Sequence, residues 1–412
     1  MKELRLIKSK SETKSLLTGN ETVAILDLGV HGYADSFFAP PEILKASFGL
    51  PLICRLDTDT GLVQTQIVTD PIERYSGVDY SYTSSNSEAA KKHWVNFAEF
   101  AKSRKRIQES KILEIGSNDG FLLSQFLDEA IQLTGVDASP YMCNLATASG
   151  IPTFQGVFGD DEDLSEMLMD RSKSYDLIFA NNVLNHSNNP VSFVKNVANL
   201  LSRDGEFIFE VPYWLETIKS LHFDQIYHEH VTYLTVGSAE KLLEMAGLYI
   251  SDVQVVDYHG GSIRIAAGHT KSLVPVPNLI RYKEAENFED LKNPIRYKKY
   301  FSDISRQKED FLLRLERFPL VEGGAVFGIG AAAKANTLLT FYGLTSDRID
   351  FILDASIHKQ GKITPVTNIP IYPDSHLLGI TGGLGITLAW NIGDTIKKRL
   401  LEINPKIEVI GI

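Results

Sequence analysis

The chain has 412 residues, which suggests two or three domains, and its apolar share of 43% and charged share of 23% are those of a globular protein. The net charge of −11 argues against nucleic acid or a membrane surface as a partner, and two cysteines exclude a disulfide framework. No run reaches the ~18 apolar residues of a membrane span, and Met1 to Asn20 lack an apolar signal core, so we expect a cytoplasmic protein.

The first 75 residues contain short strand-like runs that glycine and proline interrupt. The runs are Val23–Leu28, Pro51–Cys54 and Leu62–Val68. They predict a small β-rich module with little core of its own.

A polar, tyrosine-rich segment that includes Tyr82 comes next, and a helix is expected after it. Ser85 and Glu88 have the spacing of a capping box, which predicts the start of this helix. Its apolar face would carry three aromatic residues, Trp94, Phe97 and Phe100.

Strands and helices alternate from Lys111 onward. Four apolar runs predict buried strands: Ile112–Ile115, Leu133–Val136, Asp176–Ala180 and Glu206–Glu210. Helical patterns between them imply a parallel sheet with helices on both faces.

The segment Leu113–Gly120 is the most informative feature of the chain. An apolar run ends there in Glu114 and a glycine loop, and the next apolar run ends in Asp137. The loop lacks the Gly-x-Gly-x-x-Gly of dinucleotide sites and the Lys-Ser/Thr of triphosphate sites. Two carboxylates placed for ribose hydroxyls and an amino-acid moiety favour S-adenosylmethionine as the ligand. The alternative is an ordinary turn between a strand and a helix.

A second α/β unit follows a long charged stretch of helical spacing, Tyr282 to Phe318. Val326–Gly330 predicts a strand that enters a Gly-x-Gly turn, and Ile349–Leu353 predicts a strand that ends in Asp354. Backbone amides at the start of the next helix, with Lys334 one turn in, would bind an anion such as a phosphate group. Further strands are expected at Ile380–Leu388 and Ile407–Ile412. Two such units in one chain imply two ligands that meet between them.

The segment Tyr227–His230, Tyr-His-Glu-His, is the densest group of catalytic-looking side chains. In a helix Tyr227 and His230 would share a face, and an imidazole beside a carboxylate suits proton abstraction. The spacing does not match a His-Glu-x-x-His metal site. The alternative is a polar surface turn.

Three further residues are weaker candidates. His186 follows the strand that ends at Ala180, so it lies at the carboxyl edge of the sheet, where ligands bind. His259 begins a His-Gly-Gly-Ser turn, which is a plain turn unless a ligand binds there. Tyr82 by residue type alone is more often packed than catalytic.

These motifs in this order resemble the deoxysugar C-methyltransferases that act on nucleotide-linked 4-keto hexoses. The matching stretches are Asp27–Gly29, Gly61–Gln64, Leu113–Gly120, Tyr227–His230, His259–Ser262, Gly328–Thr337 and His358–Gly361. The resemblance spans most of the chain and implies an α/β fold in three parts. These are a small β-rich module of the zinc-binding type (1–75), a Rossmann-like class I methyltransferase domain (76–252), and a second Rossmann-like domain with bridging helices that helps to hold the nucleotide sugar (253–412).

The chain departs from this family in its N-terminal module. The family carries two Cys-x-x-Cys pairs there, whereas this chain has Asp57 and Thr60 at the second pair and no first pair. Cys54 alone cannot form a structural zinc site, which needs four nitrogen or sulfur ligands. We therefore expect the module to fold without zinc.

The resemblance implies that the methyl group of S-adenosylmethionine goes to the sugar carbon beside the ketone, through an enolate. His230 would be the base and Glu229 its orienting or polarising partner, and Tyr227, Tyr82 and His186 would bind substrate oxygens or relay the proton. The expected cofactor-binding residues are Glu114, Gly116, Asn118, Asp119, Asp137 and Asn181. The expected substrate-binding residues are His259, Lys334 and Asn336.

Three other functions remain open at this stage. One is O- or N-methylation of a similar sugar, which needs no enolate, and another is an NAD-dependent sugar oxidoreductase that uses the Gly328 loop. The third is a binding or scaffold protein descended from an enzyme, against which the intact segment Tyr227–His230 argues. The expected partner is a nucleotide-linked keto sugar, and we expect a monomer or a small homo-oligomer.

Overall fold

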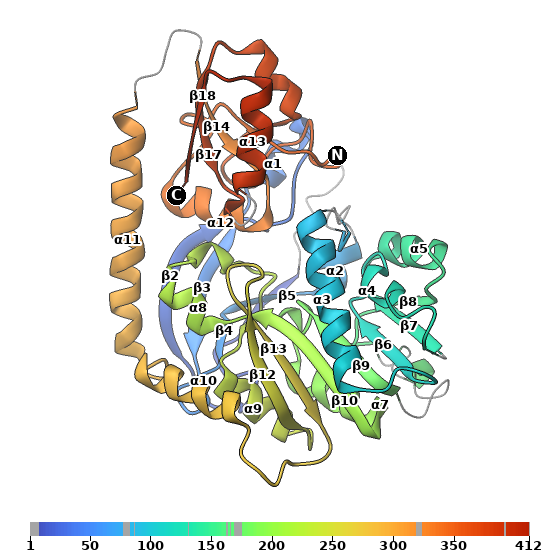
Figure 1. The fold of residues 1–412 in the computed structure, drawn as a ribbon. Helices are drawn as coiled ribbons and strands as arrows, with labels where there is room; N and C mark the ends of the chain where they lie inside the picture. The colour runs from blue at the N-terminus through green and yellow to red at the C-terminus, as the bar shows by residue number, and fades with distance from the viewer. Residues whose placement is uncertain are drawn as a thin grey trace.

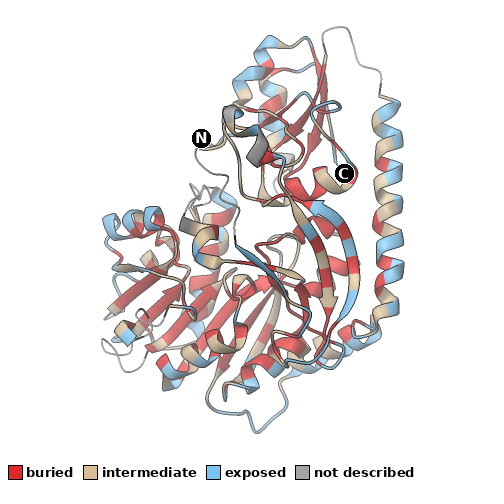
Figure 2. Cartoon of the chain, turned by 180° about the vertical axis from the view of Figure 1, so that it is seen from behind, coloured by how far each residue is buried: buried red, intermediate tan, exposed pale blue. Residues whose placement is uncertain are grey.

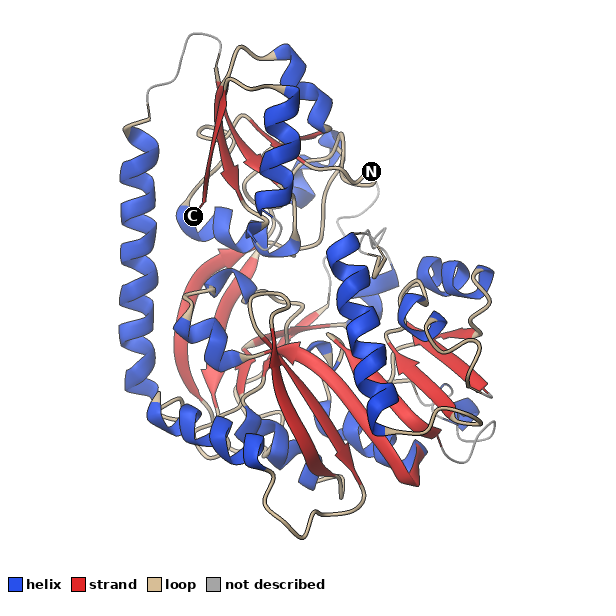
Figure 3. Ribbon diagram, viewed as in Figure 1, coloured by secondary structure: helices blue, strands red, loops and turns tan. Residues whose placement is uncertain are grey.

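The computed structural model describes residues 8–76, 83–85, 87–130, 132–161, 164, 166–168, 175–318, 324–390 and 393–411. They form an N-terminal module, a central part built on a seven-stranded sheet, and a C-terminal unit built on a five-stranded sheet (Figure 1). The strands of all three parts lie at the centre and the helices outside them (Figure 3).

The N-terminal module is mainly antiparallel. Its elements are β1 (Ser9–Ser11), β2 (Val23–His31), η1 (Pro40–Glu42), α1 (Ile43–Ala46), β3 (Leu50–Leu56), β4 (Val63–Thr65), β5 (Ile67–Thr69) and α2 (Pro71–Ser76). The four-stranded sheet has the order β11-β4-β3-β2, so its fourth strand, β11 (Thr232–Tyr233), comes from the middle of the chain. This pairing fixes the segment just after His230 against the N-terminal module.

The central sheet has the order β12-β13-β10-β9-β6-β7-β8. Its strands are β6 (Lys111–Ile115), β7 (Gln132–Asp137), β8 (Thr153–Gln155), β9 (Tyr175–Asn181), β10 (Leu201–Pro212), β12 (Tyr249–Val256) and β13 (Ser262–Gly268). Its helices are α3 (Glu88–Arg104), α4 (Phe121–Ser124), α5 (Pro140–Ala148), η2 (Leu184–His186), α7 (Pro190–Leu200), α8 (Trp214–Lys219), η3 (Phe223–Gln225) and α9 (Val236–Glu244). The four strands expected from the sequence all form, and β6 to β10 pair in parallel.

The central sheet continues past residue 252. β13 pairs antiparallel with β10 and β12 pairs antiparallel with β13, so the hydrogen-bonded sheet ends at Gly268. Both strands reach beyond residue 252, the expected end of the central domain, and in the structure they belong to the central sheet. A local sequence pattern does not tell which strand a later strand will pair with.

Helix α3 begins later than the capping-box pattern predicts. Ser87 is the N-cap residue, and its side chain accepts a hydrogen bond from the Ala90 amide. Ser85 instead donates its hydroxyl to Asp119 at 2.6 Å. The expected apolar face is confirmed, because Trp94 and Phe97 are buried.

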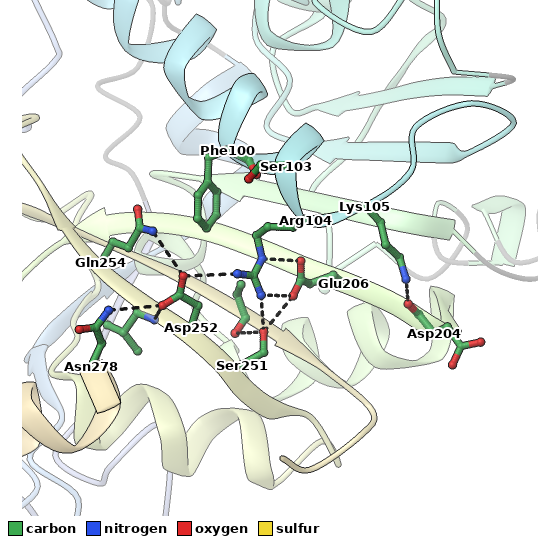
Figure 4. Close-up of polar contacts among 12 residues, drawn as sticks. Phe100, Ser103, Arg104, Lys105, Asp204, Glu206, Ser251, Asp252, Gln254 and Asn278 are labelled. Carbon is green, nitrogen blue, oxygen red and sulfur yellow. Dashed lines mark hydrogen bonds and ion pairs between the residues drawn. The ribbon is translucent and has the colours of Figure 1, made fainter. Parts of the chain in front are cut away.

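The C-terminal end of α3 is tied to the sheet by Arg104 (Figure 4). Its guanidinium donates to both carboxylate oxygens of Glu206 on β10, at 2.6 and 2.8 Å, and lies 3.3 Å from Asp252 on β12. A fork of donors to a carboxylate fixes direction as well as distance. The network therefore joins α3, β10 and β12 into one part.

The C-terminal unit follows two helices, α10 (Pro277–Phe288) and α11 (Pro294–Glu316). Its elements are β14 (Ala325–Ile329), α12 (Ala333–Tyr342), β15 (Phe351–Leu353), β16 (Ile371–Tyr372), η4 (Asp374–Gly379), β17 (Gly383–Thr387), α13 (Gly393–Ile403) and β18 (Ile407–Gly411). The strands pair in parallel in the order β16-β15-β14-β17-β18, as expected of an α/β unit. Figure 1 shows α11 running along one side of the molecule towards this unit.

Burial is concentrated in the sheets and on the inner faces of the helices (Figure 2). Helix α11 buries Tyr297, Tyr300, Ile304 and Phe311 and exposes its charged face. In the described part of the chain, no helix combines the length and the apolar character that a membrane crossing requires.

Candidate active site

The glycine loop after β6 holds a carboxylate with its backbone. The amides of Asn118 and Ser139 donate to the two carboxylate oxygens of Asp137 at 2.9 and 2.8 Å. Gly116 has a φ of +72°, and a Cβ there would lie 2.2 Å from Val183, so only glycine fits. The loop and the end of β7 therefore form one rigid edge.

A cavity that is partly open to solvent lies at this edge. Its polar lining includes Asn118, Asp137, Ser139, Asn181 and His186. Its apolar lining includes Trp94, Ile115, Val136, Val157, Phe158, Val183 and Phe193. Mostly apolar walls with a few polar groups are typical of a small-molecule site.

The cavity fits S-adenosylmethionine in its chemistry. Asp137 offers acceptor oxygens for the ribose hydroxyls, and the apolar walls suit the adenine ring. The Nδ2 of Asn181 is buried and has no hydrogen-bond partner among the described residues. An orphaned donor on a cavity wall is satisfied when a ligand brings an acceptor.

Two of the expected cofactor residues do not line this cavity. Glu114 is buried with one carboxylate oxygen unpaired among the described residues, and burial together with the charges of Asp119 and Asp137 holds its pKa well above the usual value. Asp119 accepts hydrogen bonds from the amide and hydroxyl of Ser85 and so anchors the segment before α3. Their cofactor role stays a prediction.

The segment Tyr227–His230 forms a turn, with the His230 amide bonded to the Tyr227 carbonyl at 3.0 Å, and not a helix. The turn still brings the two side chains together, because Tyr227 Oη lies 2.6 Å from His230 Nε2. His230 Nδ1 lies 2.9 Å from the Gln225 carbonyl. A carbonyl only accepts, so Nδ1 carries the proton and Nε2 accepts from the Tyr227 hydroxyl.

His186 connects this turn to the cavity. It lines the cavity, and its ring centroid lies 5.0 Å from that of His230. Its Nδ1 lies 2.7 Å from the hydroxyl of Tyr75, and Arg74 donates to its backbone carbonyl at 2.9 Å. Sequence reasoning did not select Arg74 or Tyr75 as site residues, since nothing local to them signals a contact with residue 186.

Burial sets the charges of the cluster. It lowers the pKa of His230 to about 3 and holds the pKa of His186 well below its usual value, so both imidazoles are neutral at pH 7. It holds the pKa of Tyr227 well above its usual value and raises the pKa of Glu229 to about 7. The Glu229 carboxyl is therefore about half ionised at neutral pH.

Glu229 itself has few polar neighbours. Its Oε1 accepts from the Asp35 amide at 3.3 Å, and its Oε2 is buried without a hydrogen-bond partner among the described residues. A buried carboxylate oxygen with no donor is costly unless it serves a function. Tyr82, the remaining catalytic candidate, lies outside the described residues.

On the C-terminal unit, Lys334 lies in the first turn of α12. Its Nζ is 3.8 Å from the ring centroid of Trp390, and the Trp390 Nε1 donates to Asp224 at 2.6 Å. Burial lowers the pKa of Lys334 to about 8, and the charge of Asp224 opposes this effect. A lysine held this way remains a cation for an anionic ligand at neutral pH.

The other two residues expected to bind the substrate, His259 and Asn336, also lie where the C-terminal unit contacts other parts of the chain. His259 is in the left-handed region with a φ of +51°, and burial lowers its pKa to about 3, with Lys334 contributing. A Cβ on Gly260 would lie 2.3 Å from Trp390, so this turn packs closely on the C-terminal unit. The Asn336 side-chain amide donates to the backbone carbonyl of Ala34, which makes it a contact between parts of the chain.

The N-terminal module does not fit a thiolate zinc site. Asp57 connects its own turn to the turn at Ser15–Thr18, because its carboxylate accepts hydrogen bonds from the hydroxyls of Ser15 and Thr18 at 2.6 and 2.8 Å. The amide of Thr60 also donates to it, at 3.3 Å. In this arrangement the donors satisfy a carboxylate, and Cys54 is buried on β3.

Comparison with known proteins gives two family matches. Residues 85–253 match a methyltransferase domain, and residues 257–406 match the C-methyltransferase C-terminal domain. The C-methyltransferase NovU of Streptomyces niveus is 29% identical over 328 residues, which are 78% of this chain and 77% of NovU.

The chain is also similar, over less than half of its length, to solved methyltransferase structures. One is an S-adenosylmethionine-dependent methyltransferase from Clostridium acetobutylicum, with 15% identity and a TM-score of 0.36, covering 45% of this chain and 93% of that one. Another is magnesium protoporphyrin IX methyltransferase from Synechocystis with bound S-adenosylhomocysteine, with 14% identity and a TM-score of 0.36, covering 44% and 83%.

Proposed function

Because the chain is an S-adenosylmethionine-dependent C-methyltransferase, we propose that it methylates a nucleotide-linked 4-keto sugar at the carbon beside the ketone. A carbon accepts a methyl group from a sulfonium only as a carbanion, so the substrate must first lose a proton. The enzyme then needs a base, a group that stabilises the enolate oxygen, and an aligned methyl donor.

The observation that carries this proposal is the contact between the acid–base cluster (His186, Tyr227, Glu229 and His230) and the cavity at the glycine loop. His186 belongs to both, since it lines the cavity and its ring packs against that of His230 at 5.0 Å. Transfer of the methyl group to oxygen or nitrogen would not need a base that removes a proton from carbon, because those atoms already carry lone pairs. A buried Tyr–His pair beside an ionisable Glu favours proton removal from carbon.

S-adenosylmethionine supplies an electrophilic methyl group on a sulfonium. Asp137, Asn118 and Asn181 would hold it, because their polar atoms line the cavity. The glycine at 116 allows the backbone its close turn at the cavity wall. Glu114 and Asp119 would contribute from behind the loop, since neither lines the cavity.

His230 would take the α proton on Nε2, with the Tyr227 hydroxyl as its relay. The pKa of about 3 keeps Nε2 unprotonated at neutral pH, and the bond from Nδ1 to the Gln225 carbonyl fixes the ring. An ionised Glu229 in the same turn would stabilise the imidazolium that forms. His186 and Tyr82 would bind the substrate oxygens, since the Tyr227 hydroxyl already donates to His230.

The nucleotide part would lie against the C-terminal unit. Lys334 would pair with its phosphate groups. His259 is close enough to Lys334 for the charge of the lysine to lower the pKa of the imidazole. In this proposal the sugar would lie between the nucleotide and the cofactor cavity, beside the acid–base cluster.

The test is mass spectrometry of products from a panel of nucleotide-linked 4-keto sugars incubated with S-adenosylmethionine. We expect one substrate class to gain a single methyl group and to lose its exchangeable deuterium at the carbon beside the ketone. A methyl group found on oxygen or nitrogen would contradict the proposal.

A further inference from the structure

The segment from Gly32 to Phe38 leaves the N-terminal module and runs along the C-terminal unit. A Cβ on Gly32 would lie 2.6 Å from Pro365, so the two backbones approach closely at one end of the segment. At the other end, Phe38 and Ile363 exchange two backbone hydrogen bonds, at 3.1 and 2.8 Å. Both ends of the segment are therefore fixed to the C-terminal unit.

Between these ends the segment touches the acid–base turn. The amide of Asp35 donates to Glu229 Oε1 at 3.3 Å. The preceding carbonyl, of Ala34, accepts from the side-chain amide of Asn336. The carboxylate of Asp35 lies 3.9 Å from Lys359 Nζ, which is a second link to the C-terminal unit.

Helix α12 also holds the chain that enters the turn. The hydroxyl of Thr337 donates to the carbonyl of Ile226 at 2.8 Å, one residue before Tyr227. Asn336 and Thr337 are 4% and 2% exposed, so both hydrogen bonds are shielded from water. Adjacent residues of one helix thus fix the chain on two sides of Glu229.

We infer that Asn336 and Thr337 are positioning residues for the turn Tyr227–His230. The inference rests on the proposed function, in which Glu229 supports the base. The C-terminal unit then contributes to the geometry of the acid–base cluster as well as to binding of the nucleotide. Asn336 accordingly acts through Ala34 and Asp35 and not as a ligand of the substrate phosphates.

The expected effect is kinetic. A short turn depends on such anchors for its position, and a displacement of about 1 Å can cost ~10²-fold in rate. We expect Asn336→Ala to lower kcat by about 10- to 100-fold. The KM for the nucleotide sugar and the affinity for S-adenosylmethionine should stay within about twofold, because the variant removes no contact with either ligand.

The pH profile gives a second readout. The amide of Asp35 stabilises the ionised form of Glu229 and lowers its pKa. When Asn336 no longer holds the Ala34–Asp35 peptide, this donor moves and the pKa of Glu229 rises. The rising limb of the rate should therefore shift to higher pH in Asn336→Ala.

The experiment includes a second test variant, Thr337→Val, and a control variant, Asn404→Ala. Thr337→Val keeps the side-chain volume and removes only the donor to Ile226, so it should also lower kcat, and it decides the question if Asn336→Ala fails to fold. Asn404 is a matched control, since its buried amide donates to the carbonyls of Leu377 and Ile380 in the same unit. Asn404→Ala should lower the melting temperature and leave kcat unchanged.

Hydrogen–deuterium exchange separates this inference from the proposed reaction, because it needs no substrate. Asn336→Ala should speed amide exchange in peptides that cover 33–38 and 226–230, and Asn404→Ala should not. Unchanged exchange, or a raised KM with unchanged kcat, would overturn the inference. Absence of methyl transfer by the wild type on every keto sugar would instead contradict the proposed function.

Discussion

At the turn Tyr227–His230, burial gives adjacent side chains different protonation states. The pKa of His230 falls to about 3, so the imidazole is a neutral acceptor at any pH from 5 to 9. The pKa of Glu229 rises to about 7, so this carboxyl changes charge within that range. The pH dependence of the reaction should therefore follow Glu229.

Glu229→Gln tests this assignment. A raised pKa means that Glu229 is protonated below about pH 7, so the wild-type kcat should rise with pH through about 7 as the carboxylate forms. The variant should lose this limb and retain reduced turnover. The surface residue Glu240, which pairs with Lys283, provides the control Glu240→Gln, whose pH–rate profile should match the wild type. The same limb in Glu229→Gln would assign it to another group.

Asp137 is the residue on which cofactor binding should depend most. Its carboxylate lines the cavity and is oriented by two backbone amides. Asp137→Ala should weaken S-adenosylmethionine binding by about 1–3 kcal/mol, the cost of losing charged hydrogen bonds. Calorimetry measures the effect, and the exposed Asp128→Ala is the control. Undiminished affinity in Asp137→Ala would remove it from the cofactor site.

Some site residues could be predicted from the sequence and others could not. Asp137 and His186 follow strands, and the ends of parallel strands meet at one edge, so their place could be inferred from local pattern. Tyr227 and His230 are close in sequence, so they meet in a turn as they would in a helix. The contacts of Asn336 and Tyr75 join residues far apart in the sequence, and no local pattern signals them.

At the scale of elements, the two turns of the N-terminal module are joined by Asp57. Burial alone would raise the pKa of this carboxyl, but hydrogen bonds from Ser15, Thr18 and Thr60 outweigh it, and the pKa is lowered. A depressed pKa stabilises the fold above the unfolded value of about 4. This stabilisation is lost as the pH falls through the folded value.

Asp57→Ala should therefore destabilise the protein by about 2–4 kcal/mol, because two buried hydroxyls lose their acceptor. Thermal unfolding measures this, and Asp59→Ala, at an exposed position in the same turn, is the control. Metal analysis of the wild type should find no stoichiometric zinc, and a chelator should leave its melting temperature unchanged. One zinc ion per chain that stabilises the fold would contradict this account of the module.

The positions of the helices and strands were predicted better than the pairing between strands. The strands of both α/β units form where apolar runs end in glycine or an acid, because buried parallel strands need continuous apolar sequence. Helix α3 starts later than predicted because the hydroxyl of Ser85 donates to Asp119, so that Ser87 is the N-cap residue instead. Strand β13 joins the central sheet by pairing with β10, which lies far earlier in the chain, and β12 then pairs with β13 at the edge, an arrangement that no local pattern indicates.

At the scale of the whole molecule, all three parts meet at one turn. The N-terminal module supplies the amide of Asp35, the central part supplies His186, and the C-terminal unit holds both sides of the turn through α12. A site assembled between parts binds two ligands in a fixed relation, here the methyl donor and the nucleotide sugar of the proposed reaction.

The most direct test of the central claim is exchange of the sugar α proton with solvent deuterium in the absence of a methyl donor. The wild type should incorporate deuterium at the carbon beside the ketone, and His230→Asn should lose most of this exchange while it still binds S-adenosylmethionine. General-base loss costs ~10²–10⁴-fold, which is well within reach of the measurement. Exchange and methylation by His230→Asn at the wild-type rate would contradict the account and place the base elsewhere.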